Sequence, residues 1–154
     1  MNWPENMTPQ RAPVYACNEV GIPAEPERVW RWLIRAKQWP EWYSNCSWTR
    51  LSTQELESGS TFTWKTFGVV IESTVTVFEP GKAIEWNARG PAGIRAYHGW
   101  KIDFDGHESH VITEETQAGL LISLGRPWLA SNLWRGHQIW VESLHRVVMS
   151  EKTI

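Results

Sequence analysis

The stretch IRAYHGWKIDF, residues 94–104, has the most regular alternation in the chain. Side chains two residues apart share a face of a β-strand. One face here would carry Ile94, Ala96, His98, Trp100, Ile102 and Phe104, and the other Arg95, Tyr97, Lys101 and Asp103. The pattern predicts a strand with one buried face, and it places Arg95 and Tyr97 on the protein surface.

Further β-type segments lie on both sides of this strand, separated by turn residues. Val, Ile and Thr dominate residues 69–78, as β-propensity favours, and the turn Glu79-Pro80-Gly81-Lys82 follows them. We expect the other strands over residues 14–22, 47–51, 61–67, 83–88 and 109–117. Because short turns join most of them, they predict an antiparallel sheet of about seven strands.

Two other parts of the chain have helical patterns. Pro26 opens a short helix after the first strand, and residues 37–43 form a second short helical turn. From Pro127 to about Val148 a longer pattern predicts one helix of roughly 33 Å. Its apolar face would carry Leu133, His137, Trp140, Leu144 and Val147. Gly136 costs this helix about 1 kcal/mol relative to alanine, which a close backbone approach or a bend at this position would explain.

The order of these elements predicts an α+β fold. A curved antiparallel sheet would wrap around the long C-terminal helix, with two short helices after the first strand. Residues 1–13 are rich in proline and are expected to form a flexible arm, and residues 14–154 a single domain. A sheet curved around one helix leaves a space between them, which aromatic side chains would line.

Composition excludes several classes of protein. The net charge of −2 offers no basic excess, so we expect no nucleic-acid partner. No apolar run approaches the ~20 residues of a membrane helix, and the N-terminus has no secretory pattern. These features predict a cytoplasmic protein without membrane insertion, either a monomer or a homodimer. Cys17 and Cys46 have no second cysteine nearby and are expected to be reduced.

Tryptophan is strongly over-represented, with 12 residues against 4 Phe and 3 Tyr. Several Trp side chains on inward strand positions are difficult to pack without voids, so we expect them to border a cavity. The alternative is that they form an ordinary packed core. The residues predicted to line the cavity are Trp42, Phe62, Trp64, Trp86, His98, Trp100, Glu115, Leu133, His137 and Trp140.

Three polar residues fall among these inward positions and are candidates for catalysis. His98 alternates with the apolar residues of its strand, Glu115 shares a strand face with Val111 and Thr113, and His137 lies on the apolar helix face. A carboxyl group among aromatic rings would have a raised pKa and act as an acid near neutral pH. Alternatively, the histidines are satisfied within the core, or a bulge turns Glu115 towards water.

A metal site is not expected from the remaining histidines. His107 and His110 flank a turn, where the spacing of two histidines does not converge as it does on a helix. The chain also lacks a glycine-rich phosphate loop and a nucleophile elbow. We therefore expect neither a metal nor a cofactor.

The order and spacing of several short motifs resemble the SRPBCC superfamily, also called START-like or birch-allergen-like, and within it the polyketide cyclase/dehydrase-like branch. The motifs are Ile22–Trp30, Trp39–Trp42, Gly59–Trp64, Glu79–Trp86, His98–Trp100 and Thr113–Glu115. The resemblance covers roughly residues 15–149. It implies a helix-grip fold, in which the sheet grips the long helix around a hollow for a hydrophobic or aromatic small molecule. It implies no single chemistry, because members include carriers, receptors, cyclases and chaperone activators.

Three functions are compatible with these features. The first is a binding protein that encloses a small hydrophobic or aromatic ligand. The second is a cyclase- or dehydratase-type enzyme that uses His98 or Glu115 for proton transfer. The third is a protein-interaction module with an exposed apolar patch, to which Trp3, Trp32 and Trp48 would contribute.

Overall fold

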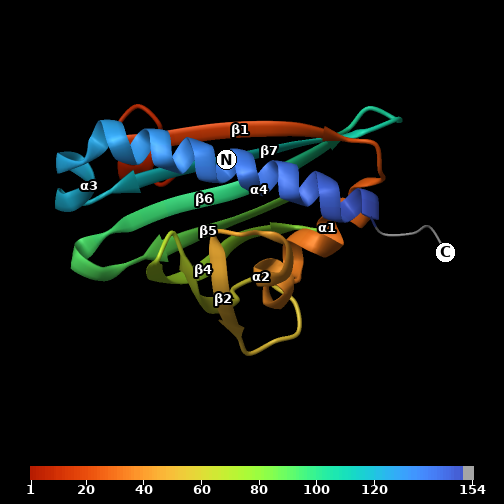
Figure 1. The fold of residues 1–154 in the computed structure, drawn as a ribbon, viewed down its shortest axis with the longest axis horizontal. Helices are drawn as coiled ribbons and strands as arrows, with labels where there is room; N and C mark the ends of the chain where they lie inside the picture. The colour runs from red at the N-terminus through yellow and green to blue at the C-terminus, as the bar shows by residue number, and fades with distance from the viewer. Residues whose placement is uncertain (151–154) are drawn as a thin grey trace.

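The computed structural model describes residues 1–150, in which one long helix crosses a seven-stranded sheet (Figure 1). The strands are β1 (Val14–Ile22), β2 (Cys46–Leu51), β3 (Thr61–Thr66), β4 (Val69–Glu79), β5 (Ala83–Arg89), β6 (Arg95–Phe104) and β7 (Ser109–Ala118). The helices are α1 (Pro26–Ile34), α2 (Trp39–Trp42), α3 (Leu120–Leu124) and α4 (Arg126–Ser150), with 3-10 turns at Glu5–Met7, Ala36–Gln38 and Pro91–Gly93.

All neighbouring strands are antiparallel, in the order β1-β7-β6-β5-β4-β3-β2. The strands from β2 to β7 follow one another along the chain, and β1 pairs with β7. This is the predicted helix-grip architecture, which is confirmed. The register sets His98 of β6 directly opposite Trp86 of β5 and Glu115 of β7.

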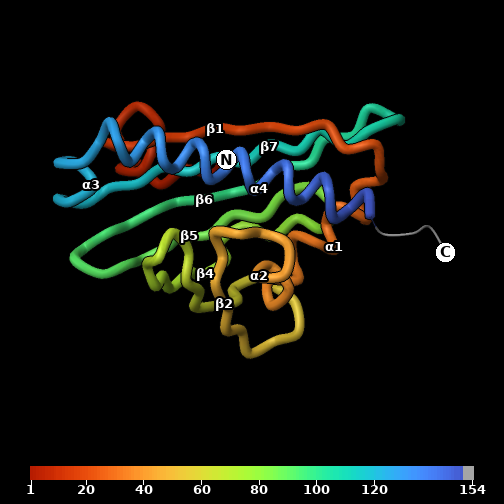
Figure 2. The backbone as a smooth tube through the Cα atoms, viewed as in Figure 1, coloured from red at the N-terminus to blue at the C-terminus, as the bar shows by residue number. Residues whose placement is uncertain are grey.

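Helix α4 lies along β1 across one face of the sheet, and α1 and α2 pack near it (Figure 2). Its buried side chains include Leu133, His137, Trp140 and Leu144, as the sequence pattern predicts. Within residues 1–150, no helix is both long enough and apolar enough to span a bilayer.

Helix α3 was not predicted from the sequence. It spans Leu120–Leu124 and is too short to show a helical period. Gly119 precedes it with φ of 137°, a conformation that favours glycine, and Gly125 ends it. The chain therefore forms a separate short helix between β7 and α4.

The surface position predicted for Tyr97 is wrong, whereas Arg95 is exposed. Tyr97 lies on the outer face of β6, but the N-terminal segment covers it, and Met7 packs against its ring. The Tyr97 hydroxyl donates to the Glu85 carboxylate at 2.7 Å, which also accepts from the backbone N–H of Asn2 at 2.7 Å. Strand alternation cannot predict a face that a distant segment covers.

The two cysteines are free thiols on the opposite edge strands β1 and β2. Burial raises the pKa of Cys46 to about 12, although its contact with the Trp48 carbonyl opposes this shift. The Cys46 thiol is therefore protonated at neutral pH and a poor nucleophile.

Gly136 lies where α4 meets the turn between β3 and β4. A Cβ atom at this position would overlap the ring of Phe67, and the Tyr43 hydroxyl lies 3.5 Å from the Gly136 carbonyl oxygen. The close approach expected at this glycine is confirmed. It holds the middle of α4 against the sheet.

We expect Gly136→Ala to lower the free energy of unfolding by roughly 1–3 kcal/mol, the usual cost of overpacking. The better helix propensity of alanine acts in the opposite direction and is the smaller effect. Ser131→Ala, on an exposed position of α4, is the control and should change stability by less than about 0.5 kcal/mol. Urea unfolding followed by circular dichroism measures both, and a more stable Gly136→Ala protein would contradict the close packing.

Candidate functional site

Aromatic rings fill the interior next to α2. Trp140 of α4 stacks on Tyr43 with ring centroids 4.4 Å apart and planes 3° from parallel. The same ring meets Trp39 at 5.4 Å, Trp64 at 5.7 Å and Trp100 at 5.0 Å. These are the distances of directly packed aromatic pairs. This half of the interior is therefore solid.

A cavity of about 250 Å³ lies beside this cluster, under the N-terminal half of α4. It is lined by Trp64, Thr66, Phe67, Val69, Ile71, Ala88, Ile94, Ala96, Glu115, Gln117, Ile122, Trp128, Leu129, Asn132, Leu133, His137 and Trp140. Ala88 and Ala96 face each other on β5 and β6. Their small side chains leave the space that larger residues fill elsewhere on the sheet.

The walls of the cavity differ in part from those predicted from the sequence. Of the predicted lining residues, it is bordered by Trp64, Glu115, Leu133, His137 and Trp140. It is not bordered by Trp42, Phe62, Trp86, His98 and Trp100, which belong to the packed interior or pack against it.

The physical reason for this difference is the segment around α2. Trp39 reaches into the curve of the sheet and is 1% exposed, with its ring 5.8 Å from Phe62 and 5.9 Å from Trp86. Sequence reasoning missed the alanines of the cavity wall. The strand alternation placed Ala96 on the inward face, and its small side chain was the feature of the sequence that could have indicated open space there.

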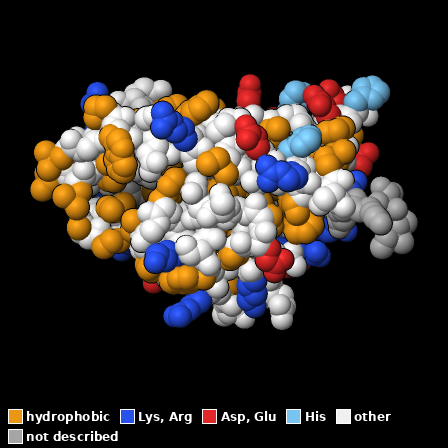
Figure 3. Space-filling model, viewed as in Figure 1, with side chains coloured by type: hydrophobic (Ala, Val, Ile, Leu, Met, Phe, Trp, Pro, Cys, Tyr) orange, Lys and Arg blue, Asp and Glu red, His pale blue; other side chains and the backbone are white. Residues whose placement is uncertain are grey.

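Apolar side chains are exposed at the outer end of the cavity. Leu120 and Leu124 of α3 are each 75% exposed, and Trp128, which borders the cavity, is 69% exposed. Figure 3 shows apolar side chains gathered at the end of the molecule where α3 and the start of α4 lie. The cavity therefore reaches the surface beside an apolar rim.

The apolar surface predicted around three tryptophans is not formed. Trp3, Trp32 and Trp48 are each partly buried. Trp3 packs on Tyr97, and Trp32 packs against the main core. Exposed apolar side chains gather instead on α3 and the start of α4.

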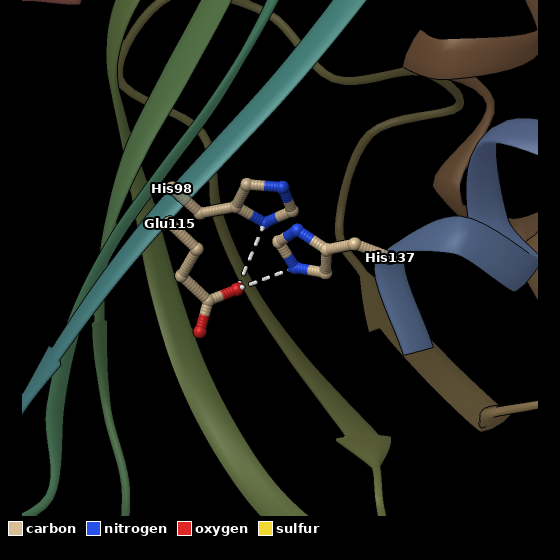
Figure 4. Close-up of side chains that lie close together, drawn as sticks. All are labelled: His98, Glu115 and His137. Atoms are coloured by element: carbon tan, nitrogen blue, oxygen red, sulfur yellow. Dashed lines mark hydrogen bonds and ion pairs between the residues drawn. The ribbon is translucent and has the colours of Figure 1, made fainter. Parts of the chain in front are cut away.

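The structure brings His98, Glu115 and His137 together from three elements (Figure 4). The Oε2 atom of Glu115 lies 3.1 Å from Nε2 of His137 and 3.5 Å from Nδ1 of His98. The two histidines are each 1% exposed and Glu115 is 9% exposed. Glu115 and His137 border the cavity, whereas His98 lies behind them.

Neighbouring polar groups hold this cluster in place. The Thr113 hydroxyl lies 2.7 Å from Nε2 of His98 and donates to the Gly99 carbonyl at 3.2 Å. On the other side, the Gln117 amide donates to Oε1 of Glu115 at 2.7 Å. The Nδ1 atoms of His98 and His137 are buried without hydrogen-bond partners among the described residues.

Burial lowers the pKa of His98 to about 3, against the attraction of Glu115. Burial also acts to raise the pKa of Glu115, but the hydrogen bond from His137 and the proximity of His98 outweigh it and lower that pKa. At neutral pH His98 is therefore neutral and Glu115 is a carboxylate. The raised pKa expected for Glu115 is wrong, because that expectation considered the aromatic walls and not the N–H donors.

A second group of potential metal ligands lies on the hairpin between β6 and β7. Asp105, Glu108 and His110 have ligand atoms within 4.8 Å of one another, and none of the three is buried. Asp105 instead accepts hydrogen bonds from the backbone of His107 and Glu108, as in an ordinary turn.

We expect acid to destabilise the protein through His98. The pKa of His98 is 6.5 in an unfolded chain and about 3 in the fold, so between these values the unfolded state binds one more proton. The free energy of unfolding should then fall by up to about 1.4 kcal/mol for each pH unit of acidification. The lowered pKa of Glu115 acts in the same direction at more acidic pH.

Urea unfolding between about pH 7 and pH 5 measures this slope. His98→Gln should reduce this slope by up to about 1.4 kcal/mol per pH unit, the contribution of one proton. His110→Gln, at an exposed residue, should leave the slope unchanged. Equal slopes in the parent and the His98→Gln protein would show that His98 accepts a proton in the folded state.

The comparisons with known proteins agree with this architecture. A solved hypothetical protein of Helicobacter pylori is similar over 96% of this chain and 95% of its own, with a TM-score of 0.87 and 22% identity. A START superfamily protein of Mycobacterium smegmatis has a TM-score of 0.75 at 11% identity, covering 90% of this chain and 99% of its own. An aromatase/cyclase from Streptomyces sp. R1128 has a TM-score of 0.73 at 12% identity, covering 88% and 93%.

At these identities the solved structures establish the fold alone. No curated protein matches the sequence. The sequence model of one family, described as "Polyketide cyclase / dehydrase and lipid transport", matches residues 18–136. That match covers most of the chain, and with the helix-grip fold it shows that the protein belongs to this family of the SRPBCC superfamily.

Proposed function

We propose that this protein binds a small hydrophobic or aromatic molecule with one polar group in the cavity between α4 and the sheet. The observation that carries the proposal is the composition of the cavity wall. Most of its residues are aliphatic or aromatic, and its side-chain carboxylate, imidazole and amide groups belong to Glu115, His137, Gln117 and Asn132. Ligand sites in proteins have this makeup of apolar walls and few placed polar groups.

The size and polarity of the cavity favour a compact ligand. Its volume of about 250 Å³ is near the lower end of ligand sites, which start at roughly 300 Å³. One ring or two fused rings would suit this space better than a long acyl chain. The Glu115 carboxylate would accept a hydrogen bond from a hydroxyl or N–H group of the ligand.

Filling the cavity should weaken binding. We expect Ala96→Phe to place its ring in the cavity and to weaken the binding of 2-naphthol, an apolar probe with one hydroxyl, by at least about 10-fold, or 1.4 kcal/mol. Isothermal titration calorimetry measures the affinity, and circular dichroism checks that the variant is folded.

Val70→Phe is the matched control for this variant. Val69 and Ile71 border the cavity, whereas Val70 lies between them on the opposite face of β4 and is 46% exposed. The same added ring should therefore leave 2-naphthol binding unchanged. Equal affinities of the two variants would place the binding site elsewhere, and no binding by the parent protein would contradict the proposal for this probe class.

A cyclase- or dehydratase-type enzyme is the second candidate, and the cluster at the cavity wall favours it. A carboxylate held by His137 and Gln117 is positioned to accept a proton from a bound molecule. In a β-ketone chain it would take the proton between two carbonyl groups. The resulting enolate would attack a further carbonyl carbon to close a ring, and the alkoxide formed there would take the proton back from Glu115. The family description contains the words polyketide cyclase and dehydrase, and one structural neighbour is called an aromatase/cyclase.

Under this second candidate, Glu115→Gln should lower the rate of ring closure of a linear β-polyketone thioester by about 10²–10⁴-fold, the usual contribution of a general base. Its affinity for 2-naphthol should change little, because glutamine keeps the shape and one acceptor oxygen. Product formation is followed by liquid chromatography and mass spectrometry. A parallel loss of rate and affinity would show that Glu115 acts through binding and not as the base, and no ring closure by the parent protein would favour a binding protein without catalysis.

The cytoplasmic location and the monomeric or homodimeric state remain predictions from the sequence. Trp3, Trp32 and Trp48, the tryptophans expected to form the surface of a protein-interaction module, are each partly buried.

A further inference from the structure

The buried cluster of His98, Glu115 and His137 has the ligand set and spacing of a metal site. One ligand atom of each residue lies within 4.8 Å of the other two. At usual Zn–N and Zn–O lengths, neighbouring ligand atoms of a tetrahedral site lie about 3.4 Å apart. The separations of 3.1 Å and 3.5 Å from Glu115 Oε2 to the two imidazole nitrogens are close to this value.

The hydrogen bonds of His98 direct its free nitrogen at the cluster. The Thr113 hydroxyl donates its one hydrogen to the Gly99 carbonyl. Its oxygen therefore accepts the hydrogen bond from the Nε2–H of His98. A neutral His98 then presents the lone pair of Nδ1 towards Glu115 Oε2, and no described residue bridges these two acceptors. Metal-binding histidines typically donate their second ring N–H to an outer acceptor in this manner.

The charge of the cluster also favours a cation. Glu115 is almost fully buried, and the groups that stabilise its carboxylate are imidazoles and the Gln117 amide, with no lysine or arginine among them. Burying a carboxylate without a cationic partner is costly. A divalent ion would provide the opposite charge, and Gln117 would continue to hold the other carboxylate oxygen.

We propose that His98, Glu115 and His137 bind one divalent transition-metal ion at the wall of the ligand cavity. This revises the sequence-based expectation of no metal. The proposal rests on the proposed function in one respect, because the coordination positions left free by three protein ligands would face the cavity and an oxygen of its ligand. Two histidines and one carboxylate suit both Zn²⁺ and Fe²⁺, so Zn²⁺ and the spectroscopic probe Co²⁺ are suitable test ions.

The test is titration of chelator-treated, full-length protein with Zn²⁺ by calorimetry and with Co²⁺ by visible absorption. We expect one ion per chain, at least about 100-fold weaker binding in Glu115→Gln and in His137→Gln, and about 10–100-fold weaker binding in Thr113→Val, which removes the acceptor behind His98. His110→Gln is the matched control. It alters the exposed Asp105, Glu108 and His110 group and should leave the affinity unchanged.

A measurement on the parent protein keeps the proposal testable if a variant does not fold. The electron paramagnetic resonance spectrum of the Cu²⁺-loaded protein should show coupling to two imidazole nitrogens. The proposal is overturned if the parent binds no ion, if binding is lost in His110→Gln and retained in Glu115→Gln, or if the spectrum lacks imidazole coupling. Binding of 2-naphthol by metal-free protein is measured in parallel, so a failed metal site is distinguished from a failed ligand site.

Discussion

The packing of Trp140 sets the position of α4 over the sheet, and the interior of the protein depends on it. Its ring is 1% exposed and is surrounded by aromatic rings from β3, β6 and the α2 region. The tightly packed half of the interior lies on this side of the helix. Towards its N-terminus, α4 passes over the cavity instead, and the space there stays open because the facing residues Ala88 and Ala96 are small. The packed half and the hollow half of the interior therefore both result from the fixed distance between α4 and the sheet.

The same constraint orients the polar cluster. His137 and Trp140 are three residues apart on α4, so they share a helix face. Whatever fixes Trp140 also fixes His137 against Glu115. On the sheet side, the antiparallel register sets His98 and Glu115 opposite each other, which leaves little freedom in their separation. Rigid elements therefore support all three side chains, a condition that both catalysis and metal binding require.

Local patterns predicted the parts of this arrangement that depend on strand parity and helical spacing. The alternation of residues 94–104 and 111–115 indicated that His98 and Glu115 face inward, and the spacing along α4 indicated the same for His137. Packing between distant segments was not predictable in this way. The position of Trp39 in the curve of the sheet and the covering of Tyr97 by the N-terminal segment are examples. The pKa of Glu115 was misjudged for the same reason, because it depends on donors from another strand position and from α4.

The buried carboxylate is the feature that a purely structural interpretation explains least well. An apolar side chain of similar volume at position 115 would pack among the same residues without the cost of desolvating a charge. Glu115 instead needs an amide and an imidazole to hold it, and it leaves the lone pair of His98 without a donor. Since Glu115 also borders the cavity, the simplest physical explanation is that its charge is used there. An organic ligand that donates a hydrogen bond, a carbon acid that gives up a proton and a metal ion would all be stabilised by that charge. They differ in what must lie between Glu115 and His98, and a metal ion there would satisfy both of these acceptors at the same time.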